Sequence, residues 1–269
     1  MKLQAKTAIV TGSSSGIGLA TAQLLARNQY SVFGFSRSEG NLPDIKALRV
    51  DVRDPQSIAA AIEQVVALTG QIDVVVNAAG YAILGAIEES SLAQAQALFD
   101  TNVLGVFRVC QAVLPYMRTQ QAGRILNIGS IVGLIPAPFM GFYASSKHAL
   151  EGYTESLGHE MRTFGVRAIL IEPEFTRTQI AHNTQHADSP LADYRLQAER
   201  LEKYISQAVE QGIDPEAVAR VILSAIAAPA PRLRYAVGKQ ARLLSQLRRL
   251  VPPALFDRSL RKQFNLDAV

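Results

Sequence analysis

Thr7-Ala8-Ile9-Val10-Thr11-Gly12-Ser13-Ser14-Ser15-Gly16-Ile17-Gly18 is the stretch that decides the fold. Its first four residues are β-branched or apolar, as in a buried strand. Three glycines follow at the spacing G-x-x-x-G-x-G, and an apolar helical pattern then runs to Asn28. In a strand–turn–helix unit of this kind, the glycines let the backbone come close to a phosphate, and the free N–H groups at the helix start bind it. We therefore expect a dinucleotide site here, with an ordinary Gly/Ser loop as the alternative.

The alternation of strand and helix continues along the chain. Further strands are predicted at residues 31–36, 47–52, 72–77, 123–130, 166–171 and 234–238, with helices between them. One helix starts at Pro55 after Asp54, a common pair at a helix beginning. This order predicts one α/β domain over residues 1–269. Its core would be a Rossmann-type doubly wound parallel sheet of about seven strands, with helices on both faces.

The end of the second predicted strand bears on which dinucleotide is bound. An acidic residue there would bind the ribose hydroxyls of NAD, but Ser36 and Arg37 stand in that place and the first acid is Glu39. Arg37 can pair with a 2′-phosphate and Ser36 can donate to it, so NADP(H) is preferred over NAD(H). The alternative is a solvated surface arginine. Asp51 is placed to meet the adenine amine, and small residues in Asn77-Ala78-Ala79-Gly80 let a flat cofactor lie close.

Tyr143 and Lys147 are four residues apart in a predicted helix, so they project from one face of it. An ammonium beside a phenol favours the phenolate, lowers the phenol pKa from about 10 and prepares it for proton transfer. Ser130 ends the preceding strand, at the sheet edge where such folds bind ligands. Asn102 joins two predicted helices, either as a solvated residue or at a kink that holds a water. By spacing alone, a solvated helix face is the alternative for the Tyr–Lys pair.

Together these motifs resemble those of the short-chain dehydrogenase/reductase family, in the family's order and over about residues 5 to 240. The matching motifs are Thr11-Gly12-x-x-x-Gly16-Ile17-Gly18, Asn77-Ala78-Ala79-Gly80, Asn102, Ser130 and Tyr143-x-x-x-Lys147. The stretch from Tyr143 to Leu157 looks most like the branch of 17β-hydroxysteroid dehydrogenases, retinol dehydrogenases and acyl-dihydroxyacetone-phosphate reductases.

The resemblance implies an oxidoreductase that transfers a hydride between NADP(H) and a carbonyl or secondary alcohol. Tyr143 would be the catalytic acid/base, and Lys147 would lower its pKa and bind the nicotinamide ribose. Ser130 would orient and polarise the substrate oxygen, and Asn102 would hold a water that links Lys147 to bulk solvent. The alternative is a non-catalytic NADP(H)-binding sensor, which has no need for this set of residues.

Contacts to the cofactor are assigned to the glycine loop, the strand ends and the loop after the sixth strand. They are Gly12, Ser14, Ser15, Gly16, Ile17, Gly18, Ser36, Arg37, Asp51, Val52, Asn77, Ala78, Ala79, Gly80, Tyr143, Lys147, Pro173, Thr176 and Thr178. One position departs from the family, because Pro173 is followed by Glu174 where glycine is usual. The loop must then do without glycine's positive φ, or Glu174 must tolerate it.

Two regions bear on the substrate. Residues 179–211 form a long polar, helical excursion with a break near Asp188-Ser189-Pro190, which we expect to be a lid over the site. No metal site is expected, because His182 and His186 lack the adjacent glutamate of a metalloprotease helix. Apolar loop residues can line a pocket for a hydrophobic ketone or alcohol, or can be loop packing: Tyr81, Ile83, Leu84, Ile131, Val132, Leu134, Pro138, Phe139 and Met140.

Positive charge is concentrated near the C-terminus. From Arg232 to Lys262 there are nine bases and one acid, whereas the rest of the chain carries a net charge of about −4, so no nucleic-acid partner is expected. The extension at about 239–269 is predicted to be a basic amphipathic helix. It makes either a weak peripheral membrane contact or a packing contact of its leucines with the domain or another subunit. The second is favoured, since no aromatic cluster anchors it.

The remaining expectations concern location and assembly. Cys110 is the only cysteine, so no internal disulfide forms, and the N-terminus is predicted to be a strand rather than a signal peptide. No apolar run reaches the length needed to cross a bilayer, so a cytoplasmic protein is expected. The long helices around Val103 and Tyr143 resemble the family's dimer faces, which implies a homodimer or homotetramer acting on a small-molecule carbonyl or alcohol.

Overall fold

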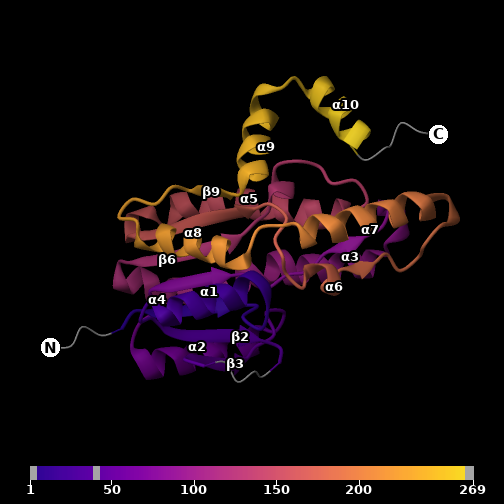
Figure 1. Cartoon of the computed structure of the whole chain (residues 1–269). Coiled ribbons are helices and arrows are strands. Elements are labelled where there is room, and N and C mark those ends of the chain that lie inside the picture. The colour runs from indigo at the N-terminus through magenta and orange to yellow at the C-terminus, as the bar shows by residue number, and fades with distance from the viewer. Residues whose placement is uncertain (1–4, 39–42, 264–269) are drawn as a thin grey trace.

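Seven parallel strands form the centre of the molecule, with helices packed on both faces (Figure 1). The computed structural model describes residues 5–38 and 43–263. The strands lie in the order β3 (Ile45–Arg49), β2 (Ser31–Ser36), β1 (Thr7–Thr11), β4 (Val74–Asn77), β6 (Gly123–Ile128), β7 (Val166–Pro173) and β9 (Arg234–Val237). The strand order reverses between β1 and β4, where sheets of this kind bind ligands at their carboxyl ends. The predicted doubly wound sheet is confirmed.

Two layers of helices bury opposite faces of the sheet. The layers are α1 (Gly16–Arg27) with α8 (Pro215–Ala227), and α2 (Pro55–Thr69) with α4 (Gly105–Gln120) and α5 (Gly141–Glu160). Because successive side chains of a strand point to opposite faces, Ile9 of β1 joins the core under α2, α4 and α5. Its neighbours Ala8 and Val10 join the core under α1 and α8. Both faces are therefore apolar, as a covered parallel sheet requires.

Local signals in the sequence set several element boundaries. The carboxylates of Asp54 and Asp214 accept hydrogen bonds from the N–H of the second residue of α2 and α8 at 2.9 and 2.8 Å, and a proline follows each cap. Such a cap contributes about 1 kcal/mol. β3 covers residues 45–49 rather than the predicted 47–52, so Val50 and Asp51 lie beyond its carboxyl end.

A continuous helical segment, Leu92–Gln120, contains Asn102. It consists of α3 (Leu92–Phe99), a π-helical stretch (Asp100–Leu104) and α4. By length and composition the segment could span a bilayer, contrary to the expectation from the sequence. However, α4 packs its apolar side, Val109 included, into the core under the sheet, as a covering helix does.

The excursion at 179–211 is less helical than predicted. It forms α6 (Ile180–Asn183), the short strand β8 (Gln185–His186) and α7 (Arg195–Glu210). β8 pairs with β5 (Ile83–Leu84), and Asp188 accepts two hydrogen bonds from Ser91, so these contacts replace helix between α6 and α7. The last helices of the described residues are α9 (Lys239–Leu250) and α10 (Pro253–Gln263). Single 3₁₀ turns lie at Ile87–Glu89, Ile131–Gly133, Arg162–Phe164 and Ala192–Tyr194.

Candidate active site

A cavity of about 740 Å³ lies along the carboxyl ends of the central strands. Its wall comes from the loops after β1, β2, β3, β4, β6 and β7, together with residues of α5, α6, α7, α9 and α10. Two of the predicted site residues, Asn77 and Asn102, do not line it. The others do: Gly12, Ser14, Ser15, Gly16, Ile17, Gly18, Ser36, Arg37, Asp51, Val52, Ala78, Ala79, Gly80, Ser130, Tyr143, Lys147, Pro173, Thr176 and Thr178. The structure thus gathers positions from most of the chain at one site.

The glycine loop after β1 has the shape that a dinucleotide phosphate requires. Gly12 has a φ of +66°, and a Cβ on it would lie 2.8 Å from the nitrogen of Ala79. A Cβ on Gly18 would lie 2.2 Å from the carbonyl oxygen of Gly12. The Thr11 hydroxyl accepts hydrogen bonds from the N–H groups of Ala78 and Ala79, both at 3.1 Å, and so joins the loops after β1 and β4. No side chain caps the N-terminus of α1, so its first N–H groups are free to bind an anion in the cavity. The residues of this loop therefore fit the phosphates of a nicotinamide dinucleotide.

The far end of the cavity is more basic than the sequence indicated. Arg37 is exposed there, while the Ser36 hydroxyl donates to the carbonyl of Ser38 at 2.5 Å. Asp51 is paired with Arg53 at 2.7 Å, and hydrogen bonds from Arg53 lower the pKa of the Asp51 carboxyl. Arg53 also lines the cavity and was missed, although its place two residues after Asp51 could have marked it. Glu39 lies outside the described residues.

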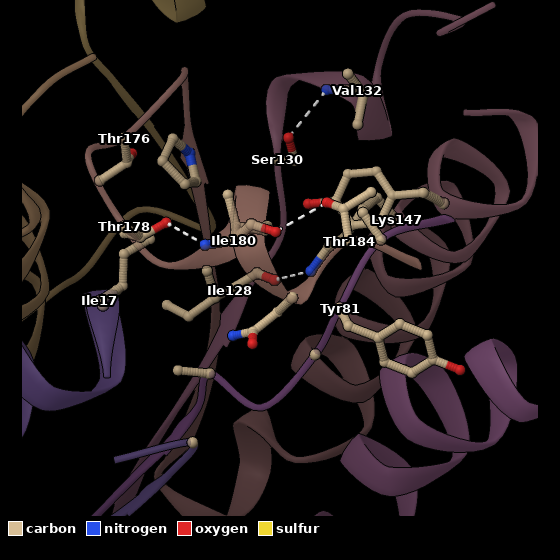
Figure 2. A pocket seen from close by; sticks show the side chains of 18 of the residues that line it. Ile17, Tyr81, Ile128, Ser130, Val132, Lys147, Thr176, Thr178, Ile180 and Thr184 are labelled. Atoms are coloured by element: carbon tan, nitrogen blue, oxygen red, sulfur yellow. Dashed lines mark hydrogen bonds between the residues drawn. The ribbon is translucent and has the colours of Figure 1, made fainter. Parts of the chain in front are cut away.

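Tyr143 and Lys147 are both buried on the cavity wall. Ser130 lines the same wall as Lys147 (Figure 2). The Lys147 ammonium donates to the carbonyl of Ile128 at 2.8 Å and lies 5.6 Å from the centre of the Tyr143 ring. The Ser130 hydroxyl accepts from the N–H of Val132 at 3.3 Å. The last residue of β6 therefore supplies the carbonyl that holds Lys147, and the loop that follows supplies Ser130.

The ionisation of this group differs from the expectation. Burial raises the pKa of Tyr143 to about 12, and a hydrogen bond with Ser130 opposes this rise. Burial lowers the pKa of Lys147 to about 8, while the charge of Glu151 opposes the fall. The expected lowering of the Tyr143 pKa by Lys147 is not seen. The reason is that desolvation outweighs other effects on the phenol, and the ammonium is held on a carbonyl rather than on the phenol oxygen.

Asn102 is buried in the π-helical stretch between α3 and α4. Its side-chain carbonyl accepts from the N–H of Tyr81 at 3.1 Å, and its amide donates to the carbonyl of Tyr81 at 2.9 Å and to Ser146 at 3.2 Å. Ser146 in turn donates to the carbonyl of Tyr143 at 2.7 Å. Asn102 thus ties the loop after β4 to the first turn of α5. The alternative of a solvated residue is wrong, because the Asn102 side chain is buried. A π-helical stretch is a place where helices can kink, and the water expected at this residue stays a prediction.

Asn77 requires a correction, because its side chain points into the protein. It is buried, donates to Asn127 at 2.9 Å and approaches the sulfur of Cys110 at 3.6 Å. Asn127 continues the chain of hydrogen bonds to Thr154 at 2.8 Å. This network joins β4, β6 and α5 within the core. The thiol is inert, since burial raises the pKa of Cys110 to about 11.

The loop after β7 resolves the departure at Glu174. The positive-φ non-glycine positions of the described chain do not include Glu174, so its backbone does without glycine's conformation. Its carboxylate accepts from the N–H groups of Gln240 and Ala241 at 2.7 and 3.1 Å and caps α9. Thr176 donates to the carbonyl of Glu174 at 2.9 Å, and Thr178 accepts from the N–H of Ile180 at 3.3 Å (Figure 2).

Apolar side chains line part of the cavity, together with polar ones such as Asn183 and Thr184. Of the predicted apolar residues, Tyr81, Ile131, Val132, Pro138 and Met140 line it. The other four pack elsewhere: Ile83 and Leu84 are buried in β5, Leu134 lies in the small core that contains Ala241, and the ring of Phe139 packs edge-on against Tyr194. Sequence reasoning did not assign specific contacts in the α7 region, where Leu201, Tyr204, Ile205 and Val209 also line the wall. His186 pairs with Glu202 at 3.4 Å, and the side chain of His182 lies outside the described part.

Comparison with known proteins gives the same fold and family throughout. A family model described as short chain dehydrogenase matches residues 6–189. The 3-ketodihydrosphingosine reductase of Bacteroides thetaiotaomicron is 35% identical over 245 residues, covering 90% of this chain and 91% of that protein. The 17-beta-hydroxysteroid dehydrogenase type 1 of Mus musculus is 36% identical over 252 residues, covering 84% of this chain and 72% of that protein.

Solved structures resemble the whole chain. A short-chain dehydrogenase from Streptomyces avermitilis superposes with a TM-score of 0.83 at 27% identity, covering 98% of each chain. A short chain dehydrogenase/reductase from Burkholderia phymatum in complex with NAD gives 0.80 at 26% identity, covering 93% of this chain and 94% of that one. ElxO with NADP bound gives 0.73 at 25% identity, covering 87% and 97%. Structures with either nicotinamide dinucleotide thus share the fold.

Proposed function

This chain belongs to the short-chain dehydrogenase family of nicotinamide-dependent oxidoreductases, and from that premise we propose that it transfers a hydride between NADP(H) and a hydrophobic carbonyl or secondary alcohol. The observation that carries the proposal is the cavity wall that holds Ser130, Tyr143 and Lys147 together with the glycine loop after β1. A proton donor and a dinucleotide cradle in one cavity are what this reaction needs.

The chain's own residues divide the work at the substrate oxygen. When bound, the nicotinamide supplies or accepts the hydride. Tyr143 keeps its proton at neutral pH, because burial holds its pKa near 12, and in reduction it gives that proton to the oxygen on which charge develops. Ser130 donates a hydrogen bond to the same oxygen. Lys147 donates one of the three N–H groups of its ammonium to the carbonyl of Ile128, so the other two can bind the nicotinamide ribose.

Preference for NADP(H) is supported by the two arginines at the far end of the cavity. Arg37 follows the last residue of β2, and Arg53 lies on the same wall. The carboxylate of Asp51 is already neutralised by Arg53, so it does not repel a 2′-phosphate as an unpaired acid would. A 2′-phosphate would therefore meet positive charge there.

A hydrophobic substrate is supported by the wall near Tyr143 and by two relatives. Ile131, Val132 and Met140 line the cavity that holds the catalytic group, and Leu201 and Ile205 of α7 line it too. Two relatives are named for activity on 3-ketodihydrosphingosine and on 17-beta-hydroxysteroids. The segment 179–211, which holds α6 and α7, is proposed to act as the lid over this part of the cavity.

Assembly and location complete the proposal. Phe107 of α4 is exposed although its ring packs edge-on against Tyr153 of α5, with 6.4 Å between the ring centres. We propose that α4 and α5 form the face of a homodimer or homotetramer, and that the protein acts in the cytoplasm. Sedimentation equilibrium of the purified chain would measure its mass, and a monomer at every concentration would contradict the oligomer.

The function is tested by turnover with both cofactors on steroids, retinoids, acyl ketones and small aldehydes. We expect reduction of a hydrophobic ketone, with a lower KM for NADPH than for NADH. Since a hydrogen bond to a charged group contributes about 1.5–3 kcal/mol, Arg37→Ala should weaken the NADPH preference roughly 10- to 100-fold. An unchanged preference would refute the role of Arg37. Tight NADPH binding without turnover on any substrate would instead indicate the sensor.

A further inference from the structure

The C-terminal helices α9 and α10, here named the hook, leave the body of the molecule beside β9 (Figure 1). Helix α9 stands away from the sheet, and α10 turns back from its end. The inner side of α9 is packed: Ala241 is fully buried, and Leu244 lies against a core that contains Ile131 and Ile135. The packing of leucines on the domain, expected from the sequence, is thus found for this side.

A second apolar side of α9 is only partly covered, because Leu247 is half-buried while Leu243 and Leu250 are exposed. Leu243, Leu247 and Leu250 are spaced i, i+4 and i+7, so they share one helix face. Leu243 lies roughly 200° around the helix from Ala241, whereas Leu247, three residues after Leu244, lies at the border of the packed side. Leu243 is 56% exposed and Leu250 is 80% exposed. An outward leucine stripe on a helix that already packs its other side needs a partner.

The charges around the stripe decide which partner fits. Residues 239–262 hold seven bases and one acid. The acid, Asp257, pairs with Arg261 at 3.4 Å, and exposed Arg242 and Arg258 add positive charge. A second copy of the chain would bring the same positive charge to the stripe, whereas an anionic lipid surface offers negative charge at its headgroups and apolar depth beneath them.

We propose that the hook docks on an anionic lipid bilayer, with Leu243, Leu247 and Leu250 at the headgroup boundary and the arginines among the headgroups. The hook also contributes Leu244 and Leu260 to the wall of the large cavity. Docking therefore brings one wall of the cavity close to the lipid. The docking stands on the hook alone and does not depend on which reaction the cavity supports.

The test is co-sedimentation of the full-length protein with lipid vesicles. Phosphatidylcholine vesicles that contain phosphatidylglycerol should bind about tenfold more protein than pure phosphatidylcholine vesicles, and high salt should remove most of the difference. The variant Leu243→Asp/Leu250→Asp should lose the binding. Its control is Leu68→Asp on α2, because Leu68 is 57% exposed and so matches Leu243. Circular dichroism of each variant verifies that it is folded.

Four results would overturn the proposal. The first is a wild-type protein that ignores anionic vesicles, and the second is equal loss of binding in the Leu68 variant and the double variant. The third is a double variant that binds like the wild type. The fourth is a fall in oligomer mass caused by the double substitution in a protein that binds no vesicles, which would show that the stripe is an interface between copies of the chain. A double variant that does not fold leaves the wild-type lipid and salt dependence to decide.

Discussion

Two cations, the buried Lys147 and the half-buried Arg234, are held in opposite ways. Lys147 of α5 has one neutral partner, the carbonyl of Ile128, and burial lowers its pKa to about 8. Arg234 of β9 is bound by three carboxylates, those of Glu151, Glu155 and Glu172. Burial alone would lower the pKa of Arg234, but these carboxylates outweigh it and raise the pKa.

Lys147 can therefore take part in a reaction, whereas Arg234 stabilises the fold. A cation on a neutral acceptor keeps donors to offer and can titrate, so Lys147 suits a reaction site. A guanidinium enclosed by carboxylates cannot change its state, and Arg234 joins β9 to α5 and β7 instead. Glu151 connects the two, because it lies four residues after Lys147 on the same helix.

Removal of the phenol beside Lys147 should have the largest effect on activity. In Tyr143→Phe, turnover should fall about 10²–10⁴-fold, because the proton donor is lost while the ring and its packing stay. The measurement is kcat with saturating cofactor, with cofactor binding and thermal unfolding as controls. A variant with near wild-type kcat would show that Tyr143 is not the acid.

Removal of Arg234 should have the largest effect on stability. Arg234→Met leaves Glu151 and Glu172, both buried, without their cation, and breaking a buried pair in this way costs about 3–5 kcal/mol. The measurement is the free energy of unfolding in urea. The control is Arg220→Met, whose exposed pair with Glu216 at 3.0 Å should contribute less than about 1 kcal/mol. Equal losses of stability in the two variants would show that the Arg234 ion pairs contribute no more than the exposed pair of Arg220.

These two groups also show what a sequence can and cannot predict. The sheet, the glycine loop, the capped helices and the shared face of Tyr143 and Lys147 depend on residues a few positions apart, and the structure bears them out. The partners of the buried charges lie far away: Ile128 is 19 residues from Lys147, and Glu151 is 83 residues from Arg234. Only the folded sheet brings them together.

The expectations for Asn77, Tyr143 and Glu174 were wrong or incomplete for the same reason, because the surroundings of each residue come from distant parts of the chain. Asn77 has a site-like position in sequence, but its side chain turns to Asn127 on the neighbouring strand. The pKa of Tyr143 depends on how deeply the ring is buried, and no local pattern encodes that depth. From the sequence, Glu174 is only a replacement for a glycine. Its role as a cap cannot be predicted locally, because the helix that it caps, α9, begins 65 residues later.

Glu151, beside Arg234, and Lys147 should change the free energy of unfolding with pH in opposite directions. Burial and the charge of Glu172 raise the pKa of Glu151 from 4.5 to about 7, so the folded protein holds a proton that the unfolded chain releases. Stability should therefore fall as pH rises from about 4.5 to about 7. Lys147 has its pKa lowered from 10.5 to about 8, so between these values the unfolded chain binds more protons and stability should rise with pH.

Variants assign each slope to its residue. Glu151→Gln should flatten the acidic slope and keep the alkaline one, which should reach to lower pH because the charge of Glu151 no longer holds up the pKa of Lys147. Lys147→Met should remove the alkaline slope and keep the acidic one. The free energy of unfolding in urea at a series of pH values measures both. If both slopes persist in both variants, other groups produce them and the contrast between the two environments fails.

Glu174 gives the smallest effect, because its carboxylate is held by N–H groups rather than by a buried ion. It accepts from Gln240 and Ala241, the second and third residues of α9, as a capping side chain does. Glu174→Gly restores the glycine usual in the family and should lower the free energy of unfolding by about 1 kcal/mol. Glu174→Gln keeps an acceptor oxygen and should lose only the part that comes from the charge at the helix N-terminus, a few tenths of that amount. Amide hydrogen exchange separates a cap from a general contact, since only a cap predicts faster exchange confined to the first turn of α9. Exchange that rises evenly over the whole domain would mean that Glu174 supports the fold at large, and that α9 does not depend on it for its start.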